Sequence, residues 1–397
     1  MDFSLPKDLL EFIELAELNK IIEKELKPFV LKLDEAKEYP SNFINKLRAA
    51  FMGIWIPEKY GGAGHGILGL AFVMEAIAKV CTGASTAYAA NALCALPILF
   101  SGTEDQKKKY FAKIAAGEYL GAFCLTEPES GSDAFAMKAK AVKDGDCYIL
   151  NGEKQFITNA GQADVYVVFA KTNPAKGARG ISGFIAEKGF PGLSFSEKWE
   201  KMGLHCSETR NVIFSDCRVP GNNLLGGKEG IGVFTIFNTL IRSRILVGAQ
   251  GVGCANGAFV AALDYAKKRT QFGQNIVNFQ AIQHKLAEMA RKIEAARLMV
   301  YKAAWIADKS EKKRKGVKAK EQKDDIAKLG AMAKYYGADV ASEVTLDAVK
   351  ILGGSGYMRE SGVEKFHRDA VALALYEGTK EMQLNEIAQI LIKESAK

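Results

Sequence analysis

The hydrophobic pattern of the chain changes twice, near residues 121 and 232, and these changes constrain the fold more than any other feature. Before the first change and after the second, apolar residues recur at the mixed spacing of three and four that a helix requires. Between them, apolar and polar residues alternate, which is typical of β-strands. The pattern predicts an α+β multidomain protein, with an N-terminal α-helical domain (1–120), a central β-sheet domain (121–231) and a C-terminal helical domain (232–397).

Three segments of the first domain carry clear helical signals. One amphipathic helix is expected within residues 9–29. Two further helices, within 68–80 and 85–102, are apolar nearly all round and should therefore be buried. Thr103, followed three residues later by Gln106, predicts a capping box at the start of another helix.

Glycine-containing dipeptides predict turns in the other two domains. Asp144-Gly145 and Asn151-Gly152 are each flanked by alternating segments, so both predict β-hairpin turns. Gly353-Gly354 follows a long helical pattern and predicts its C-terminal end.

Several function classes are disfavoured by composition. No uninterrupted run of about 18 apolar residues occurs, so no membrane span is expected. The first residues include Asp2 and Asp8 and contain no apolar signal core, which predicts a cytoplasmic protein. The seven cysteines form no CxxC pair, and the four histidines have unrelated spacings, so free thiols and no metal site are expected.

The net charge of +8 has one concentrated source, the segment 308–325, which contains seven lysines and one arginine. Such a segment can bind a polyanion or form a solvated connection between helices. Acidic residues are interleaved and no aromatic residue is present, which favours the connection. Nucleic-acid binding is therefore not predicted.

Two loops of the central domain carry candidate ligand contacts. CLTEPESGSD (124–133) combines hydroxyls with a proline-constrained turn, so it is either an acidic surface loop or a loop that directs N–H groups and hydroxyls at a polar ring or phosphate. In QFITNAG (155–161), Phe156 and Thr158 lie two apart and should share one strand face. They would suit a flat heteroaromatic cofactor, although an ordinary core aromatic residue has the same pattern.

These loops belong to a set of motifs that covers essentially the whole chain: LTEPESGSD, QFITNAG, KMGLHCSETRNVIFSDCRVP, RTQFGQ, ILGGSGY with HRDA after it, and YEGTKEMQ. In order and spacing, the set resembles the acyl-CoA dehydrogenase family of flavoproteins, especially its short- and medium-chain members such as butyryl-CoA dehydrogenases. The resemblance implies a C-terminal four-helix bundle, bound FAD and a homotetramer in which one subunit commonly contributes to its neighbour's FAD site.

The same resemblance implies three groups of binding residues. Those implied for the flavin, some of which also line the acyl-CoA site, are Phe123, Leu125, Thr126, Gly131, Ser132, Phe156, Ile157, Thr158 and Thr379. Those implied for the FAD diphosphate and adenosine are Arg269, Thr270, Gln271, Phe272, Phe279, Gln280 and, toward a neighbouring subunit, Lys350, Leu352, Gly353 and Gly354. Those implied for the substrate are Ser132, Ile241, Arg244, Tyr376, Gly378, Ser85, Tyr88 and Ala89.

Glu377 matches the family's catalytic base, which removes the Cα proton of an acyl thioester while a hydride leaves Cβ for flavin N5. The resemblance implies that the backbone N–H of the base also binds the thioester carbonyl. Burial beside the apolar segment that precedes it should raise the pKa of Glu377 toward the working pH. Some relatives place the base instead on the helix beside the equivalent of Arg244, where this chain has Ser243.

The chain departs from the family pattern at several positions, among them Phe156, where many relatives have Trp. The family often shows LDxxR where this chain has Ile241 in place of the acid, so a polar contact to the CoA arm is missing or made elsewhere. Several relatives have Gln where this chain has Lys350, which would suit a diphosphate as a point charge. Ala84 stands where glutaryl-CoA dehydrogenases carry an arginine, which argues against a dicarboxyl substrate.

The expected activity is α,β-dehydrogenation of a short to medium acyl-CoA, with electrons passed to an electron-transfer flavoprotein. Three alternatives stay open on the same fold: an enoyl-CoA reductase, a dehydrogenase of cyclic or branched acyl-CoA, and a flavin-dependent oxidase. A non-enzymatic paralogue is disfavoured because both Glu377 and Arg244 are present.

Overall fold

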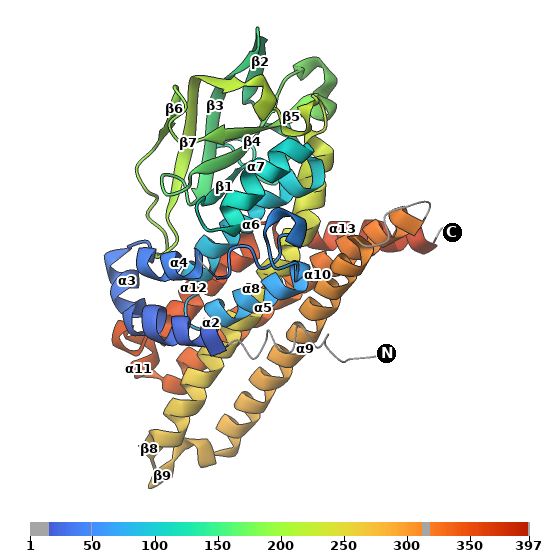
Figure 1. The fold of residues 1–397 in the computed structure, drawn as a ribbon. Coiled ribbons are helices and arrows are strands. Elements are labelled where there is room, and N and C mark those ends of the chain that lie inside the picture. The colour runs from blue at the N-terminus through green and yellow to red at the C-terminus, as the bar shows by residue number, and fades with distance from the viewer. Residues whose placement is uncertain (1–15, 49, 312–317, 396–397) are drawn as a thin grey trace.

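The computed structural model describes residues 16–48, 50–311 and 318–395, and Figure 1 shows how they are arranged. Helices come first, a sheet follows, and long helices complete the chain, so the predicted fold class is confirmed. The N-terminal helices are α2 (Ala16–Ile21), α3 (Val30–Ala36), α4 (Ser41–Arg48), α5 (Gly66–Ala78), α6 (Thr82–Ser101) and α7 (Glu104–Ala115).

The first expected helix (9–29) begins outside the described residues, as do Asp2 and Asp8. Its described part is interrupted, because a π-helical turn (Ile22–Leu26) and a 3-10 turn (Lys27–Phe29) separate α2 from α3. Pro28 lies in the second turn, and a proline has no N–H to continue an α-helical ladder. The single-helix prediction is therefore wrong for this part.

The other N-terminal predictions are confirmed. The hydroxyl of Thr103 accepts from the Gln106 N–H at 3.2 Å, and the Gln106 side chain accepts from the Thr103 N–H at 3.1 Å. This capping box starts α7. Helices α5 and α6 are largely buried, as their all-round apolar pattern predicts.

The central domain is a seven-stranded mixed sheet in the order β1-β4-β2-β3-β7-β6, with β5 paired to β4. Strand β1 is parallel to β4, and β2 is parallel to β4, whereas the other pairs are antiparallel. The strands are β1 (Gly121–Cys124), β2 (Lys140–Asp144), β3 (Cys147–Thr158), β4 (Val165–Lys171), β5 (Ile181–Glu187), β6 (Leu193–Phe195) and β7 (Thr209–Pro220).

Of the two predicted hairpins, one is confirmed and one is wrong. Asp144 pairs with Cys147 across a tight turn in which Gly145 has a φ of 59°. Gly152, in contrast, lies inside β3, where the pairing with β7 shifts register between Leu150 and Gly152. Its φ of 144° and the approach of Ala139 explain the glycine, because an added Cβ would lie 2.7 Å from the Ala139 Cβ.

The C-terminal part contains α8 (Gly232–Lys268), α9 (Gln280–Glu311), α10 (Lys318–Leu352), α11 (Gly354–Tyr357), α12 (Val363–Leu375) and α13 (Lys380–Ser395). A small hairpin of β8 (Thr270–Gln271) and β9 (Gln274–Asn275) follows α8 and lies at one tip of the molecule (Figure 1). Glycines let α8 and α10 pack closely, since a Cβ on Gly251 would lie 2.4 Å from the Gly337 carbonyl oxygen. Helix α10 ends beside Gly353, whose φ is 60°, as predicted.

Buried polar contacts join the sheet to α6. The Gly121 N–H at the start of β1 donates to the Asn91 side chain at 2.7 Å. Asn159, just after β3, donates to the Ala87 carbonyl at 2.9 Å. The edge of the sheet where β1 starts and β3 ends is therefore fixed to the helix on which Ser85, Tyr88 and Ala89 lie.

All seven cysteines are free thiols, and Cys81 and Cys206 are in contact with their sulfurs 3.5 Å apart. Within the described ranges, no group of three His, Cys, Asp or Glu side chains could hold a metal ion. Helices α6 and α8 are long and apolar enough to cross a membrane by length and composition alone. Their most apolar windows are 72% and 78% buried, as in core helices, so they are weak evidence for a span.

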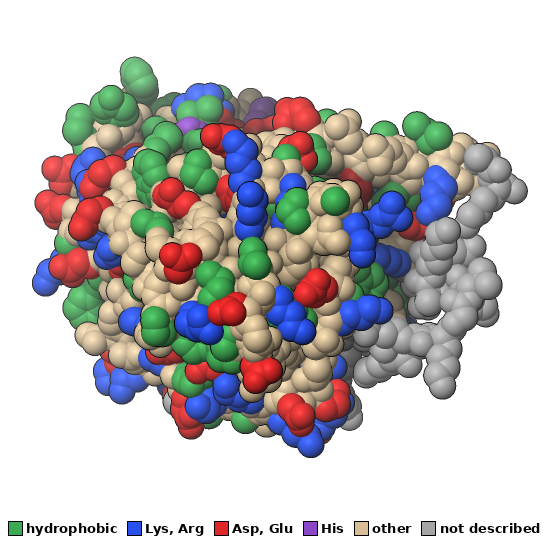
Figure 2. Space-filling model, turned by 90° about the horizontal axis from the view of Figure 1, so that it is seen from above, with side chains coloured by type: hydrophobic (Ala, Val, Ile, Leu, Met, Phe, Trp, Pro, Cys, Tyr) green, Lys and Arg blue, Asp and Glu red, His purple; other side chains and the backbone are tan. Residues whose placement is uncertain are grey.

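The positive charge is not gathered into one patch on the face drawn in Figure 2, where basic and acidic side chains are interspersed. Of the basic segment 308–325, residues 308–311 belong to α9 and 318–325 to α10, and residues 312–317 between them lie outside the described part of the chain. The flanking helices fit the predicted role as a helix-to-helix connection.

Candidate active site

Glu377 lies in the short connection between α12 and α13, in an uncommon backbone conformation. Its φ is 58° and that of Gly378 is 94°. Left-handed φ costs a residue with a side chain roughly 1–2 kcal/mol, so surrounding contacts must enforce it. Gly378 is required by its own φ and by packing, because an added Cβ would lie 2.6 Å from the Gln383 side-chain nitrogen.

Side chains from three helices hold the carbonyl groups of this loop. Lys334 on α10 donates to the carbonyls of Ala374 and Gly378 at 3.0 and 2.7 Å. Gln383 on α13 donates to the carbonyls of Glu377 and Gly378 at 3.1 and 3.0 Å. Arg244 on α8 adds a longer contact of 3.4 Å to the Glu377 carbonyl. The loop is therefore fixed by tertiary contacts rather than by its own sequence.

The Glu377 carboxylate is hydrogen-bonded to α8. Ser243 donates its hydroxyl proton to Oε2 at 2.5 Å. Burial raises the pKa of Glu377, while the Ser243 hydrogen bond and the charges of Arg244 and Lys334 oppose that rise. A raised pKa makes the Glu377 carboxylate a stronger base than an exposed glutamate.

The backbone N–H of Glu377 is a second potential contact. Within the described chain, no protein group accepts a hydrogen bond from it. Backbone donors in buried surroundings are nearly always paired in folded proteins. The unpaired N–H of Glu377 is therefore a candidate donor to an oxygen atom of a bound ligand. A carboxylate and a free donor thus come from the same residue.

Arg244 is retained, as the motif predicts, but its carboxylate partner comes from an unexpected place. Its guanidinium forms an ion pair with Glu386 on α13. Ile241, predicted to contact substrate, is fully buried, and its carbonyl packs against Gly330 of α10. The structure thus gives Ile241 a packing position, and the carboxylate beside Arg244 is that of Glu386 on α13.

A chain of polar contacts links the loop to α6. The Tyr376 hydroxyl donates to the Gln250 side chain at 2.8 Å. Gln250 donates in turn to the hydroxyls of Thr86 and Ser85, at 3.1 and 3.4 Å. The predicted acyl-pocket residues on this helix are buried or half-buried, and the Tyr88 hydroxyl is already bonded to the Phe51 carbonyl at 2.6 Å.

The predicted flavin contacts of β1 and β3 lie side by side. The Gln155 N–H donates to the Thr126 carbonyl at 2.8 Å, which joins the two loops. A buried ion pair of 2.7 Å between Lys154 and Glu127 also connects the two loops. Around this junction, Leu125 is buried, Phe123 and Thr126 are half-buried, and Gly131 and Ser132 are exposed.

Phe156 lies in a β-bulge of β3. The register with β7 shifts between Lys154 and Ile157, and Phe156 has a φ of 58°. Phe156 is 56% exposed, and its ring centroid lies 5.3 Å from that of Trp199. Ile157 is buried between the exposed Phe156 and the half-buried Thr158. The bulge interrupts the regular alternation of the strand, so the predicted sharing of one face by Phe156 and Thr158 stays a prediction.

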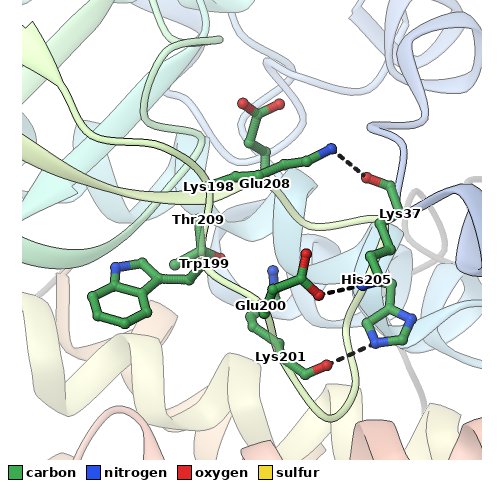
Figure 3. Close-up of a pocket in the computed structure, with 8 residues that line it drawn as sticks. All are labelled: Lys37, Lys198, Trp199, Glu200, Lys201, His205, Glu208 and Thr209. Carbon is green, nitrogen blue, oxygen red and sulfur yellow. Dashed lines mark hydrogen bonds and ion pairs between the residues drawn. The ribbon is translucent and has the colours of Figure 1, made fainter.

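Trp199 belongs to a loop that Figure 3 shows against the N-terminal helices. Lys37, next to α3, forms an ion pair with Glu200 of this loop. His205 lies 2.8 Å from the Lys201 carbonyl and 3.0 Å from the Asp34 carbonyl. These contacts anchor the loop to the N-terminal helices. The cavity that they enclose has a volume of only about 10 Å³, room for one water molecule, so it is too small for a ligand.

The remaining predicted FAD contacts lie at the far end of α8. Arg269 borders a groove of about 410 Å³ whose lining includes Tyr265 and Ser355, 3.5 Å apart. Next to this groove, Phe272 is 93% exposed. The other members of the group are Thr270, Gln271, Phe279, Gln280, Lys350, Leu352, Gly353 and Gly354, which lie after α8, at the start of α9 and at the end of α10.

The two groups of predicted FAD contacts do not meet within one chain. From Arg244 to Lys268, α8 runs 24 residues, a distance of about 36 Å. The structure therefore brings Arg269 together with the end of α10, but not with Glu377.

The sequence of helical, sheet and helical domains, with a loop-borne carboxylate and an exposed aromatic pair, is typical of flavin-dependent dehydrogenases. Models of the acyl-CoA dehydrogenase N-terminal, middle and C-terminal domains match residues 14–118, 122–217 and 230–392. The chain belongs to the acyl-CoA dehydrogenase family of oxidoreductases.

Individual relatives are similar over nearly their whole length. The short-chain-specific acyl-CoA dehydrogenase of Megasphaera elsdenii is 43% identical over 390 residues, 97% of this chain and 98% of that protein. The structure of butyryl-CoA dehydrogenase from the same organism matches with a TM-score of 0.92 and 40% identity, over 99% of this chain and 100% of that one. A chain solved in work on the electron transferring flavoprotein of Acidaminococcus fermentans and flavin-based electron bifurcation matches with a TM-score of 0.93 and 44% identity, over 99% and 100%.

Sequence reasoning missed most of the partners that hold the site. These are Trp199, Gln250, Lys334, Gln383 and Glu386, together with Ser243, which was noted only as a non-acidic position. Except for Gln383, which ends the motif YEGTKEMQ, none belongs to the motif around Glu377. Only the placement of polar residues within otherwise apolar helix faces, as at Lys334, gave a signal that could have revealed them.

Proposed function

We propose that this chain catalyses α,β-dehydrogenation of an acyl-CoA thioester, with Glu377 removing the Cα proton. The observation that carries the proposal is the Glu377 loop, in which a carboxylate of raised pKa and an unpaired N–H come from one fixed residue. The carboxylate would take the proton, and the N–H would donate to the thioester carbonyl as negative charge develops there.

The residues of this site fit FAD as the cofactor. Phe156 and Trp199 offer exposed rings, Thr126 and Thr158 offer hydroxyls beside them, and Arg269 borders a groove that can take a phosphate or a nucleoside. FAD supplies the acceptor for the hydride that leaves Cβ. The roles of Arg244 and Ser243 are to position the Glu377 loop and to hold its carboxylate ready for the proton.

The separation of the two groups of FAD contacts supports an oligomer. Since Arg269 lies about 36 Å along α8 from Arg244, a second copy would supply Arg269 and its neighbours to the Glu377 site. We propose the homotetramer that the resemblance implies. An electron-transfer flavoprotein is the proposed electron acceptor, supported by the subject of the Acidaminococcus work. A cytoplasmic location stays a prediction.

A short, linear acyl group is the proposed substrate, supported by the short-chain-specific relative. Ala84 is fully buried and uncharged, so that position offers no cation for a distal carboxylate. The same catalytic groups would serve the reverse reaction, enoyl-CoA reduction. Branched and cyclic acyl-CoA substrates are compared with linear ones in the assay below.

The activity is tested by an anaerobic titration of the flavin-loaded protein, followed by its visible spectrum. We expect butyryl-CoA to bleach the flavin band, octanoyl-CoA to bleach it less, and glutaryl-CoA to leave it unchanged. Isobutyryl-CoA and cyclohexanecarboxyl-CoA test the branched and cyclic alternatives. If no acyl-CoA bleaches the band, the proposed dehydrogenation is wrong.

The contact between Ser243 and Glu377 predicts a pH effect. The Ser243 hydrogen bond lowers the pKa of Glu377 against the effect of burial, so Ser243→Ala should raise that pKa. Because the deprotonated carboxylate accepts the proton, the acid limb of the kcat/KM profile should move to higher pH. Ser342→Ala removes a hydroxyl that bonds only within α10 and is the control. An acid limb that does not move in Ser243→Ala would show that this contact does not tune the base.

A further inference from the structure

Lys334 is one of the most deeply buried lysines of the described chain, with 1% of its surface exposed. It lies on α10 and donates to the carbonyl oxygens of Ala374 and Gly378. These carbonyls flank Glu377, one in the last turn of α12 and the other just after the base. A single ammonium group therefore connects both sides of the loop that carries Glu377.

Carbonyl groups, rather than a carboxylate, satisfy this buried charge. Within the described residues, no acidic side chain lies within ion-pair distance of Lys334. The last carbonyls of a helix lack intrahelical partners and carry partial negative charge, so Ala374 is a suitable acceptor. A buried ammonium group is costly in free energy unless it is hydrogen-bonded. The Lys334 side chain is therefore stable in this position only while the loop carbonyls accept its hydrogen bonds, and these bonds in turn hold the loop.

The loop needs this support because two successive residues, Glu377 and Gly378, have positive φ. Gln383 holds the same two carbonyls from α13, and it is itself buried. Lys334 adds what Gln383 cannot, a contact to the end of α12 and a positive charge.

That charge acts on the base. The charged groups around Lys334 are Glu377 on the loop, Arg244 on α8, Asp339 on α10 and Glu381 on α13. Asp339 is already in an ion pair with Lys380. Lys334 in turn is one of the cations that oppose the rise in the pKa of Glu377, whereas burial lowers the pKa of Lys334 itself to about 8.

We propose that Lys334 is a positioning residue for the reaction: it fixes the loop that carries Glu377 and supplies a positive charge that favours the carboxylate form of the base. The inference rests on the proposed role of Glu377. Lys334 itself touches no reacting atom.

The test uses Lys334→Gln, which keeps a donor without the charge, and Lys334→Met, which keeps neither. Both variants should move the acid limb of kcat/KM to higher pH, by about half a unit or more, because the pKa of Glu377 rises when the cation is removed. At neutral pH, kcat should fall about 10- to 100-fold in Lys334→Met and less in Lys334→Gln, with a smaller change in KM.

A second readout needs neither substrate nor flavin. Amide hydrogen exchange in a peptide covering 374–383 should be about 10-fold faster in Lys334→Met than in the unchanged protein. Lys328→Met is the matched control, since Lys328 lies on the same helix but pairs with Glu394 and Asp325. This control should leave both readouts unchanged.

The possible results distinguish the proposed dehydrogenase activity from the proposed role of Lys334. If the unchanged protein shows no flavin reduction by any acyl-CoA, the proposed function fails, and the exchange measurement still tests whether Lys334 fixes the loop. If the unchanged protein is active and folded Lys334→Gln keeps its acid limb, Lys334 only stabilises the fold and the proposal is overturned. If Lys334→Met does not fold, Lys334→Gln alone decides.

Discussion

Replacing Glu377 by Gln should lower the rate of flavin reduction by butyryl-CoA about 1,000-fold or more, while FAD stays bound. Gln has nearly the same shape, and the Ser243 hydroxyl can donate to its amide oxygen as it does to Oε2. The substitution therefore removes the proton acceptor and leaves the packing of the loop intact. General-base catalysis contributes on the order of 100- to 10,000-fold, so the loss should be near the upper end of that range. Stopped-flow absorbance of the flavin band measures it.

The matched control is Glu343→Gln, an exposed carboxylate on α10 that pairs with Lys292. It should reduce flavin at the rate of the unchanged protein. A Glu377→Gln variant with full activity would assign proton abstraction to another group. A variant that also loses FAD would show that Glu377 supports the fold of the cofactor site, so retention of the visible spectrum is measured first.

Replacing Gly378 by Ala should have the second-largest effect. Its φ of 94° is unfavourable for alanine, and the new Cβ would lie 2.6 Å from the Gln383 side-chain nitrogen and 3.6 Å from the Met382 Cβ. Gln383 is buried and bonded to two carbonyls of the loop, so it cannot move without releasing them. We expect the free energy of unfolding to fall by about 1–3 kcal/mol. We also expect kcat/KM to fall about 10- to 100-fold as the base shifts.

Gly145→Ala is the control for backbone strain alone. Gly145 has a φ of 59° in the β2–β3 turn, and an added Cβ would meet no atom within 4 Å. This variant should lose about 1 kcal/mol of stability and keep its kcat/KM. If Gly378→Ala behaves like Gly145→Ala in both measurements, close packing around the loop does not position the base.

The fold was predictable from the sequence because its main signal, hydrophobic periodicity, is local. Errors arose where one residue overrides that signal. Pro28 interrupts a helical pattern by removing an N–H, and Gly152 marks a bulge inside β3 rather than a turn. In each case, backbone chemistry at one position outweighed the average over a window.

The site was predictable only in part, for a physical reason. A family motif identified Glu377, but the groups that fix its backbone come from α8, α10 and α13. Ser243 lies 134 positions before Glu377, and Lys334 lies 44 positions before Gly378. Their contacts exist only after the helices pack, so no local spacing reveals them. Ile241 is buried by the packing of α8 against α10, which its position in the motif did not indicate, and its substrate contact stays a prediction.

The contact between Ser243 and Glu377 also bears on how such sites change over evolution. The Ser243 oxygen, on α8, and the Glu377 carboxylate, on the loop between α12 and α13, lie only 2.5 Å apart. An acid introduced at position 243 would therefore place its charge where the Glu377 carboxylate now lies. An ancestral enzyme could exchange the acid between the two segments through an intermediate that carried both, with the two carboxylates sharing one proton.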